Sequence, residues 1–257
     1  MNVIYILRIK LHQFYINMWS IVKKEFNQFF SNLIGYISII LFLLINGVFL
    51  FVLEDSNIFN YGYASLEKFF ELAPWVLLFL IPAISMRCFS DEYKFGTFET
   101  LKTKPLSSNQ IVLGKYIAIL LIVLLVLLPS LIYVVTIKSL SATGVIDNGA
   151  IIGSYIGLVF LCAVYAAVGL CCSGLTTNAV VAFLLSVFVC LLLYFGFSAI
   201  SKLSFLQGNV GFYIEMFGID FHYKNISRGV IDTRDVVYFI SIIFVSIFIT
   251  SKKISNN

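Results

Sequence analysis

Six long apolar segments, separated by shorter polar stretches, are the feature that most constrains how this chain folds. They cover residues 33–53, 69–88, 108–137, 150–172, 179–200 and 236–250. One crossing of a lipid bilayer needs about 20 residues of helix. Backbone groups inside hydrocarbon must bond within their own segment, so runs of this kind form helices. The sequence therefore predicts an all-α, polytopic membrane protein with one domain of six transmembrane helices over residues 33–250.

The composition supports a membrane protein and argues against other classes. Of the 257 residues, 60% are hydrophobic and only 12% are charged, which is roughly half the charged fraction of a soluble domain. The basic residues form no stripe interleaved with aromatic residues, so we expect no nucleic-acid partner. The five cysteines lie in or beside apolar runs, and their odd number argues against a disulfide framework. We expect them to be buried small hydrophobic residues.

The chain shows no sequence pattern for chemistry of its own. It has neither a Gly-rich phosphate loop ending in Lys-Ser/Thr nor a His-Glu-x-x-His motif. His12 and His222 are far apart, and we expect each at the surface or the membrane interface rather than as a ligand. We therefore expect no catalytic residue, no metal and no cofactor on this chain. An ion-coupled secondary transporter is an alternative, although such proteins usually place ionisable residues inside the bilayer.

Residues 1–32 are expected to form an N-terminal extension and an interfacial helix. From residue 15 to residue 33, apolar residues recur every three or four positions, and polar residues fill the opposite face. The apolar positions are Tyr15, Met18, Trp19, Val22, Phe26, Phe29, Phe30 and Leu33. We expect this helix to lie in the membrane surface, with Lys23 and Lys24 anchored among lipid headgroups. An ordinary helix packed on soluble protein is the alternative.

The distribution of Lys and Arg predicts the orientation in the membrane. If the N-terminus is cytoplasmic, the inner segments hold 11 of the 17 Lys and Arg residues. These are Arg8, Lys10, Lys23, Lys24, Arg87, Lys94, Lys102, Lys104, Lys115, Lys252 and Lys253. Six crossings then place both termini in the cytoplasm. Charged residues interrupt residues 1–17, so we expect no cleavable signal peptide, and Met18 is a candidate translation start.

Prolines and glycines predict local helix geometry. Pro82 in the second segment and Pro129 in the third each remove a backbone donor and should kink their helices. Gly153-x-x-x-Gly157 begins a face of small residues on the fourth segment. Close packing against another helix of the same chain is one interpretation, and a dedicated dimer interface is the other.

The loop at residues 87–106, between the second and third segments, is the most charged part of the chain. Residues 91–104 are typical of one or two short helices broken at Gly96, and Pro105 should end the unit. Ser107-x-x-Gln110 then matches a capping box at the start of the third helix. We expect a compact, folded loop; the alternative is a solvated loop whose charges only enforce topology.

This loop carries a resemblance to a known family. The motif is Asp91-Glu92-x-x-x-Gly96-Thr97-x-Glu99-Thr100-Leu101-x-Thr103-x-Pro105-Leu106, followed by Ile111-Val112-Leu113-Gly114-Lys115. It resembles the hallmark of ABC-2-type transporter permeases. Three dispersed stretches (73–75, 153–157 and 227–235) are similar to one branch, the permease subunit of the gliding-motility-associated ABC transporter of Bacteroidetes. The resemblance runs from about Met18 to the sixth segment.

The resemblance implies a function and its partners. In such permeases this loop is a coupling helix that docks on a separate ATPase subunit, which binds ATP and Mg. The residues that match the coupling motif here are Glu92, Gly96, Thr97, Glu99 and Thr100. The family also implies a second permease half, so a dimer, in the bacterial cytoplasmic (inner) membrane, with an accessory gliding-motility membrane protein as a further partner.

Three further expectations accompany the resemblance. Lys102 and Lys104 would sit at the height of the lipid headgroups and anchor the loop. Residues 201–235 would form short re-entrant or surface helices. Many relatives carry Ser-Pro where this chain has Ser31-Asn32, which puts the sharpness of the elbow before the first crossing in doubt. A membrane scaffold of a motility or secretion machine, which does not itself transport, is the alternative function, because it would share the same loop.

Overall fold

The computed structural model describes residues 3–53, 65–104, 106–140, 147–203, 208–229 and 232–256, with side chains from Phe14 onward. Within these residues the chain is helical and contains no strand. Six helical stretches are long and apolar enough to cross a membrane, which confirms the predicted all-α polytopic architecture. Pro105 of the sequence motif and the side chain of His12 lie outside the described residues.

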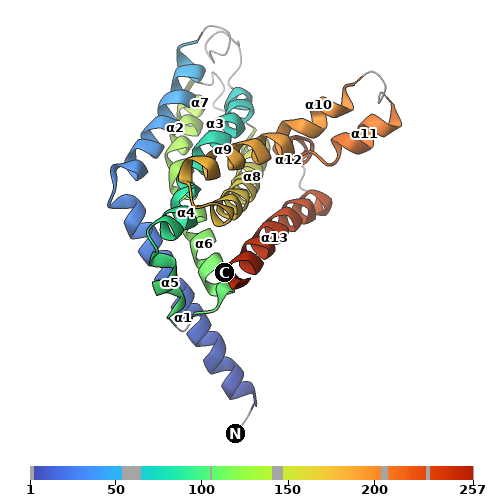
Figure 1. The fold of residues 1–257 in the computed structure, drawn as a ribbon. Helices are drawn as coiled ribbons and strands as arrows, with labels where there is room; N and C mark the ends of the chain where they lie inside the picture. The colour runs from blue at the N-terminus through green and yellow to red at the C-terminus, as the bar shows by residue number, and fades with distance from the viewer. Residues whose placement is uncertain are drawn as a thin grey trace.

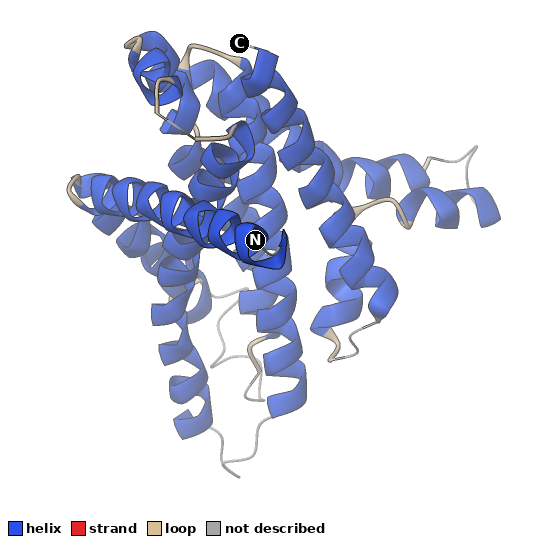
Figure 2. Cartoon of the chain, turned by 90° about the horizontal axis from the view of Figure 1, so that it is seen from below, coloured by secondary structure: helices blue, strands red, loops and turns tan. Residues whose placement is uncertain are grey.

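Figures 1 and 2 show the arrangement of the helices. The first half contains α1 (Val3–Phe30), α2 (Leu33–Phe51), α3 (Glu67–Ser85), α4 (Arg87–Lys94), α5 (Thr97–Lys102), α6 (Ser108–Leu127), η2 (Leu128–Ser130) and α7 (Leu131–Leu140). The second half contains α8 (Asn148–Leu175), α9 (Ala179–Leu191), η3 (Leu192–Gly196), α10 (Phe197–Ser201), α11 (Asn209–Glu215), α12 (Ile219–Ser227) and α13 (Thr233–Asn256).

Helix α8 is the central helix of the bundle. It contacts α3, α6, α9, α12 and α13, and it is the most enclosed of the six candidate spans. Small residues along α8 allow these close contacts. A Cβ on Gly153 would lie 2.8 Å from the Cα of Gly229 and 2.9 Å from the carbonyl oxygen of Ile226. The small-residue face therefore packs within the chain, as the first interpretation predicted, and the end that carries Gly153 is covered.

Helix α1 lies against the first turns of α6. A Cβ on Gly114 would lie 2.9 Å from the Cβ of Ile21 and 3.2 Å from the carbonyl oxygen of Met18. Met18, Ile21 and Val22 are buried there, whereas Tyr15 and Trp19 are exposed. The predicted apolar stripe is thus divided between the chain's own core and its surface. Exposed aromatic residues beside a transmembrane bundle are compatible with the expected interfacial position.

The two prolines expected to kink helices differ in their local structure. Pro82 lies inside α3 together with Pro74, and the helix continues to Ser85. Pro129 lies in η2, a single 3₁₀ turn that separates α6 from α7. A 3₁₀ turn in a long helix is a common response to the donor that proline removes.

The segment after α10 forms two short helices, as the resemblance implied for the described part of residues 201–235. In Figures 1 and 2, α10 and α11 project sideways from the bundle, and Phe212 and Tyr213 of α11 are exposed. Helix α12 instead packs on α8. The hydroxyl of Tyr223 donates to the carbonyl oxygen of Phe70 at 2.8 Å, and burial raises the pKa of this phenol well above its usual value.

His222 on α12 corrects one expectation from the sequence. It is buried rather than placed at a surface, and its Nδ1 lies 2.6 Å from Oδ1 of Asp235. Its Nε2 lies 2.8 Å from the carbonyl oxygen of Met216, and its ring stacks on Tyr238. A lone histidine in the sequence gave no sign of Asp235, because the pair forms only when α12 packs against α13.

Candidate functional site: the folded loop between the second and third spans

The charged loop begins where α3 passes into α4. The hydroxyl of Ser173, on α8, accepts hydrogen bonds from the amides of Phe89 and Ser90, at 3.0 and 3.2 Å. The same hydroxyl donates to the carbonyl oxygen of Met86 at 2.8 Å. These are backbone groups at the α3–α4 junction and in the first turn of α4, where helical partners run out. A side chain far away in the sequence therefore fixes the start of α4.

Aromatic side chains fill the space between α4 and α5. Tyr93 and Phe98 meet edge to face with their ring centroids 4.8 Å apart, and Phe89 contacts both rings. Gly96 connects the two helices with φ of 69°, and a Cβ there would meet open space. This left-handed conformation favours glycine. The loop is thus a folded unit broken at Gly96, which we call the knob (Arg87–Lys102), and the predicted break is confirmed.

The predicted coupling residues fall into two groups on the knob. Gly96, Thr97, Glu99 and Thr100 are exposed, while the apolar Phe98 and Leu101 point into the core. The neighbouring Phe95 is also exposed. The knob therefore presents a polar edge with one aromatic ring on a base that is fixed by its own apolar residues.

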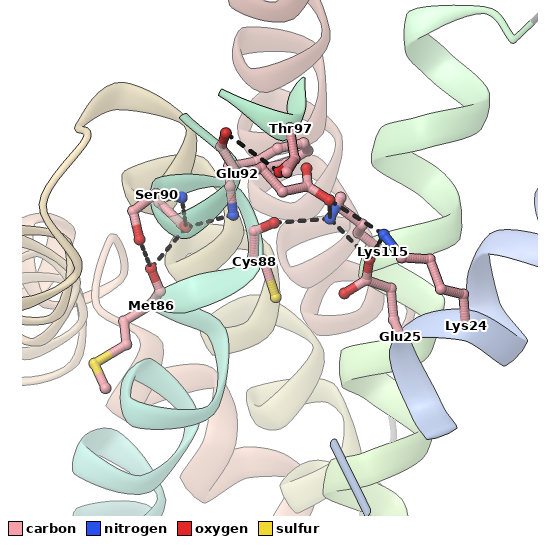
Figure 3. A network of polar contacts seen from close by, with 10 residues as sticks. Lys24, Glu25, Met86, Cys88, Ser90, Glu92, Thr97 and Lys115 are labelled. Atoms are coloured by element: carbon pink, nitrogen blue, oxygen red, sulfur yellow. Dashed lines mark hydrogen bonds and ion pairs between the residues drawn. The ribbon is translucent and has the colours of Figure 1, made fainter. Parts of the chain in front are cut away.

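Glu92 lies in a different environment from the exposed group. Only 14% of its side chain is exposed, and its Oε1 accepts a hydrogen bond from Nζ of Lys115 at 2.9 Å (Figure 3). Nζ of Lys24 lies 3.4 Å from the same oxygen. Glu92 is therefore engaged within the chain, and its Oε1 is not directed at a docking partner in this conformation.

Lys115 is the centre of a buried ion-pair network. Its side chain is 1% exposed, and its Nζ donates to Glu25 at 2.9 Å, to Glu92 at 2.9 Å and to the carbonyl oxygen of Cys88 at 2.7 Å. The ammonium also lies over the ring of Phe89. A buried cation is stable only when paired and hydrogen bonded, and here all three donors are used. The network joins α1, α4 and α6 (Figure 3).

Four lysines were expected to anchor the protein among lipid headgroups. Lys23, Lys102 and Lys104 are exposed, and Nζ of Lys102 lies 5.7 Å from the ring centroid of Phe98. Lys24 is 53% exposed on its side chain and reaches the carboxylates of Glu25 and Glu92. Lys24 thus belongs to the edge of the network around Lys115.

Sequence reasoning did not assign Glu25, Lys115 or Ser173 to this site. Lys115 carried a usable signal, because it follows the apolar residues at the start of a span, where a charge needs a partner. Glu25 is one of several polar residues of α1, and nothing in its local sequence indicated a buried partner. Ser173 resembled any small residue of a membrane helix, and only the packing of α8 on α4 reveals its role.

The predicted capping box after the knob is confirmed. The hydroxyl of Ser107 accepts from the amide of Gln110, and the side chain of Gln110 accepts from the amide of Ser107. The side-chain amide of Gln110 also donates to the carbonyl oxygen of Phe14 at 3.5 Å. This cap fixes both the start of α6 and the position of α1 beside it.

The knob and α12 lie at opposite ends of α8. Gly153 meets α12 and Ser173 meets α4. Twenty residues of helix separate them, which corresponds to about 30 Å at 1.5 Å per residue. This length is close to the thickness of the hydrocarbon core. The knob and α12 are therefore separated by about the thickness of one membrane crossing.

A polytopic helical bundle with a structured loop at one end is the architecture of an integral membrane protein. A family model described as ABC-2 family transporter protein matches residues 19–215. This match spans well over half of the chain, and the chain belongs to that family. It is therefore an integral membrane protein and the permease type of subunit of an ABC transporter, which is not the catalytic subunit. The search of curated proteins finds no match.

Proposed function

We propose that the knob is the docking element for a separate ATPase subunit, which binds ATP and Mg and drives this permease. The observation that carries the proposal is the orientation of the knob. Its apolar residues Phe98 and Leu101 are buried in the chain, while Glu99 and Thr100 face outward on α5. A rigid base with an exposed polar edge suits recognition by a soluble protein partner.

The knob is connected to the bundle by three routes that would transmit motion. Ser173 joins it to α8, and Lys115 joins it to α6. Glu25 shares the ammonium of Lys115, so α1 is connected as well. A displacement of the knob would therefore pull on α1, α6 and α8 at once, because separating buried ion pairs and hydrogen bonds is costly. Glu92 would serve this transmission rather than contact the ATPase.

The more specific assignment is the gliding-motility-associated branch, supported by the dispersed motifs of the sequence. In this proposal the chain pairs with a second permease half in the bacterial inner membrane. The knob and both termini face the cytoplasm, as the bias of Lys and Arg indicates. An accessory gliding-motility membrane protein would be a further partner.

Copurification with the candidate ATPase subunit tests the docking. Glu99→Lys reverses a charge on the exposed edge without touching the ion-pair network, so it should weaken the complex by about tenfold or more, since like charges at an interface are strongly unfavourable. ATP hydrolysis stimulated by the permease should fall in parallel. Glu71→Lys, also an exposed glutamate but near the opposite end of the bundle, is the matched control and should leave both measurements unchanged.

Equal complex formation by wild type and Glu99→Lys would overturn the docking assignment. Glu92→Lys is a less specific variant, because it also places a second cation beside Lys115. Stimulated ATP hydrolysis distinguishes a transporting permease from a membrane scaffold. A permease should stimulate ATP hydrolysis in reconstituted vesicles in a manner that depends on the knob, whereas a scaffold should form the complex without stimulation.

A further inference from the structure

A cavity of about 470 Å³ lies between α1, the α3–α4 junction and α6. Its volume falls within the range of small-molecule sites, roughly 300–1,000 Å³. One part is lined by apolar residues of the membrane spans, among them Ile84, Ala118, Ile119 and Ile122, all of which are buried. The rim contains exposed residues in the last turn of α1 and in the elbow after it, such as Gln28 and Asn32. The cavity thus runs from charged surroundings into the apolar part of the bundle.

The charges that line this cavity are balanced. Three cations, Lys24, Arg87 and Lys115, and three carboxylates, Glu25, Asp91 and Glu92, contribute to its wall. A wall with no formal net charge does not favour an anion or a cation as such. Separate positive and negative groups around one space instead suit a ligand that carries both signs.

One carboxylate in this wall makes no hydrogen bond or ion pair with the described residues. The carboxylates of Glu25 and Glu92 are paired with Lys115 and Lys24, and the unpartnered Oε2 of Glu92 is too enclosed for a ligand to reach. Asp91 also lines the cavity and is partly exposed, so its carboxylate can accept hydrogen bonds from a donor that enters. A primary ammonium supplies three N–H donors, whereas a quaternary ammonium supplies none.

We propose that this cavity binds a zwitterionic phospholipid of the surrounding bilayer whose headgroup ends in a primary ammonium, namely phosphatidylethanolamine. The ammonium donates to the carboxylate of Asp91, and the phosphate lies between Lys24 and Arg87. Part of one acyl chain lies along Ile84, Ala118, Ile119 and Ile122. Phe95 and Thr97 of the knob also line the cavity, so the bound lipid contacts the element that we propose couples to the ATPase.

Lipid binding is measured on the full chain alone, so its outcome is independent of ATPase docking. The purified protein, stripped of lipid in detergent, is titrated with phosphatidylethanolamine, phosphatidylcholine or phosphatidylglycerol of identical acyl chains, and bound lipid is counted by native mass spectrometry. One phosphatidylethanolamine should bind at least about fivefold more tightly than the other two lipids, because only it combines N–H donors with a zwitterion. Equal affinity for phosphatidylcholine, or tighter binding of phosphatidylglycerol, would overturn the proposal.

Adjacent lysines provide a matched pair of variants. Lys24 lines the cavity and Lys23 does not, although both are exposed cations on α1. Lys24→Ala and Arg87→Ala should each weaken phosphatidylethanolamine binding about three- to tenfold, whereas Lys23→Ala should change it less than twofold. Equal losses for Lys23→Ala and Lys24→Ala would show general attraction to headgroups and refute a built site.

A second variant tests the apolar part of the cavity. Ala118→Leu fills space beside Ile119 and Ile122 without changing any charge, and it should weaken binding of the long-chain lipid by about fivefold or more. Its melting temperature, measured in the same detergent, confirms that the variant is folded. Unchanged lipid affinity in folded Ala118→Leu would contradict the placement of the acyl chain.

Discussion

The two ends of α8 are built in different ways. At the knob, α4 is held by polar and charged contacts: the hydroxyl of Ser173 on its first amides and the ammonium of Lys115 between two carboxylates. At the other end, close packing adds to the polar contacts, because Gly153 lets the backbone of α12 approach α8 closely. The polar contacts there include the hydroxyl of Tyr223 on the carbonyl oxygen of Phe70 and the buried pair of His222 with Asp235.

The difference teaches what each end is suited to do. Close-packed contacts tolerate little displacement, since neighbouring atoms clash when one helix slides past another. A network of hydrogen bonds and ion pairs has discrete partners that can be exchanged, and it joins several helices at one point. The knob end is therefore suited to transmit a movement, and the α12 end is suited to keep its helix fixed. Four substitutions test this contrast.

Lys115→Ala should have the largest effect. It leaves Glu25 and Glu92 facing each other without their shared cation, which should cost about 3–5 kcal/mol of stability. Thermal unfolding of the purified protein in detergent, followed by circular dichroism, measures the loss. Lys104→Ala, an exposed lysine just after the knob, should have almost no effect. A melting temperature of Lys115→Ala equal to wild type would mean that the network is not a structural element.

Gly153→Ala tests the packing at the other end. The added Cβ would lie within 3 Å of backbone atoms of Ile226 and Gly229, so α12 must shift, at a cost of about 1–3 kcal/mol. Gly47→Ala is the matched glycine, because its Cβ would meet only the hydroxyl of Tyr133 at 3.4 Å. Equal melting temperatures for the two variants would refute close packing as the basis of the α12 end.

Ser173→Ala should have a smaller effect, close to that of a lost helix cap. The amides of Phe89 and Ser90 lose their acceptor, which should cost about 1 kcal/mol. Hydrogen exchange should rise at these amides specifically. Ser38→Ala removes a buried hydroxyl that bonds only to its own helix, and it should leave exchange in α4 unchanged. Unaltered exchange at Phe89 in Ser173→Ala would show that α8 does not hold the start of the knob.

Lys224→Ala should have the smallest effect of the four. Its ammonium lies 2.6 Å from Oδ2 of Asp220; 61% of the lysine side chain is exposed, against 12% of that of the aspartate. Water screens the exposed ammonium, and Asp220 keeps its hydrogen bond with Tyr194, so the loss should stay near the roughly 0.3–0.5 kcal/mol of a surface i,i+4 pair. Thermal unfolding should barely distinguish this variant from wild type, in contrast with Lys115→Ala. A loss of stability as large as that of Lys115→Ala would remove the distinction between the two ends of α8.

Much of the architecture could be predicted from the sequence, because the features that specify it are local. Apolar runs predicted the six spans, and Ser107 with Gln110 predicted the start of α6. Gly96 predicted the break in the knob, since a positive φ excludes most other residues. The second span extends further than predicted, over Glu67–Lys94, because α4 continues from α3 after only one intervening residue.

The environment of individual polar residues could not be predicted in the same way. Glu92 and Glu99 belong to the same motif, yet the first is half-buried against Lys115 and the second is exposed. His222 looked isolated until α13 brought Asp235 to it. Each of these outcomes depends on a contact between segments that are distant in the chain, and a local pattern carries no information about such contacts.

The sequence by itself determined that the chain forms six membrane-spanning helices with a folded charged loop, because hydrocarbon leaves the backbone no other way to satisfy its hydrogen bonds. Only the tertiary structure decided which charges become buried partners, which serine caps the knob and where a cavity forms. These features arise from how helices pack, and packing depends on the shapes of several distant segments at once.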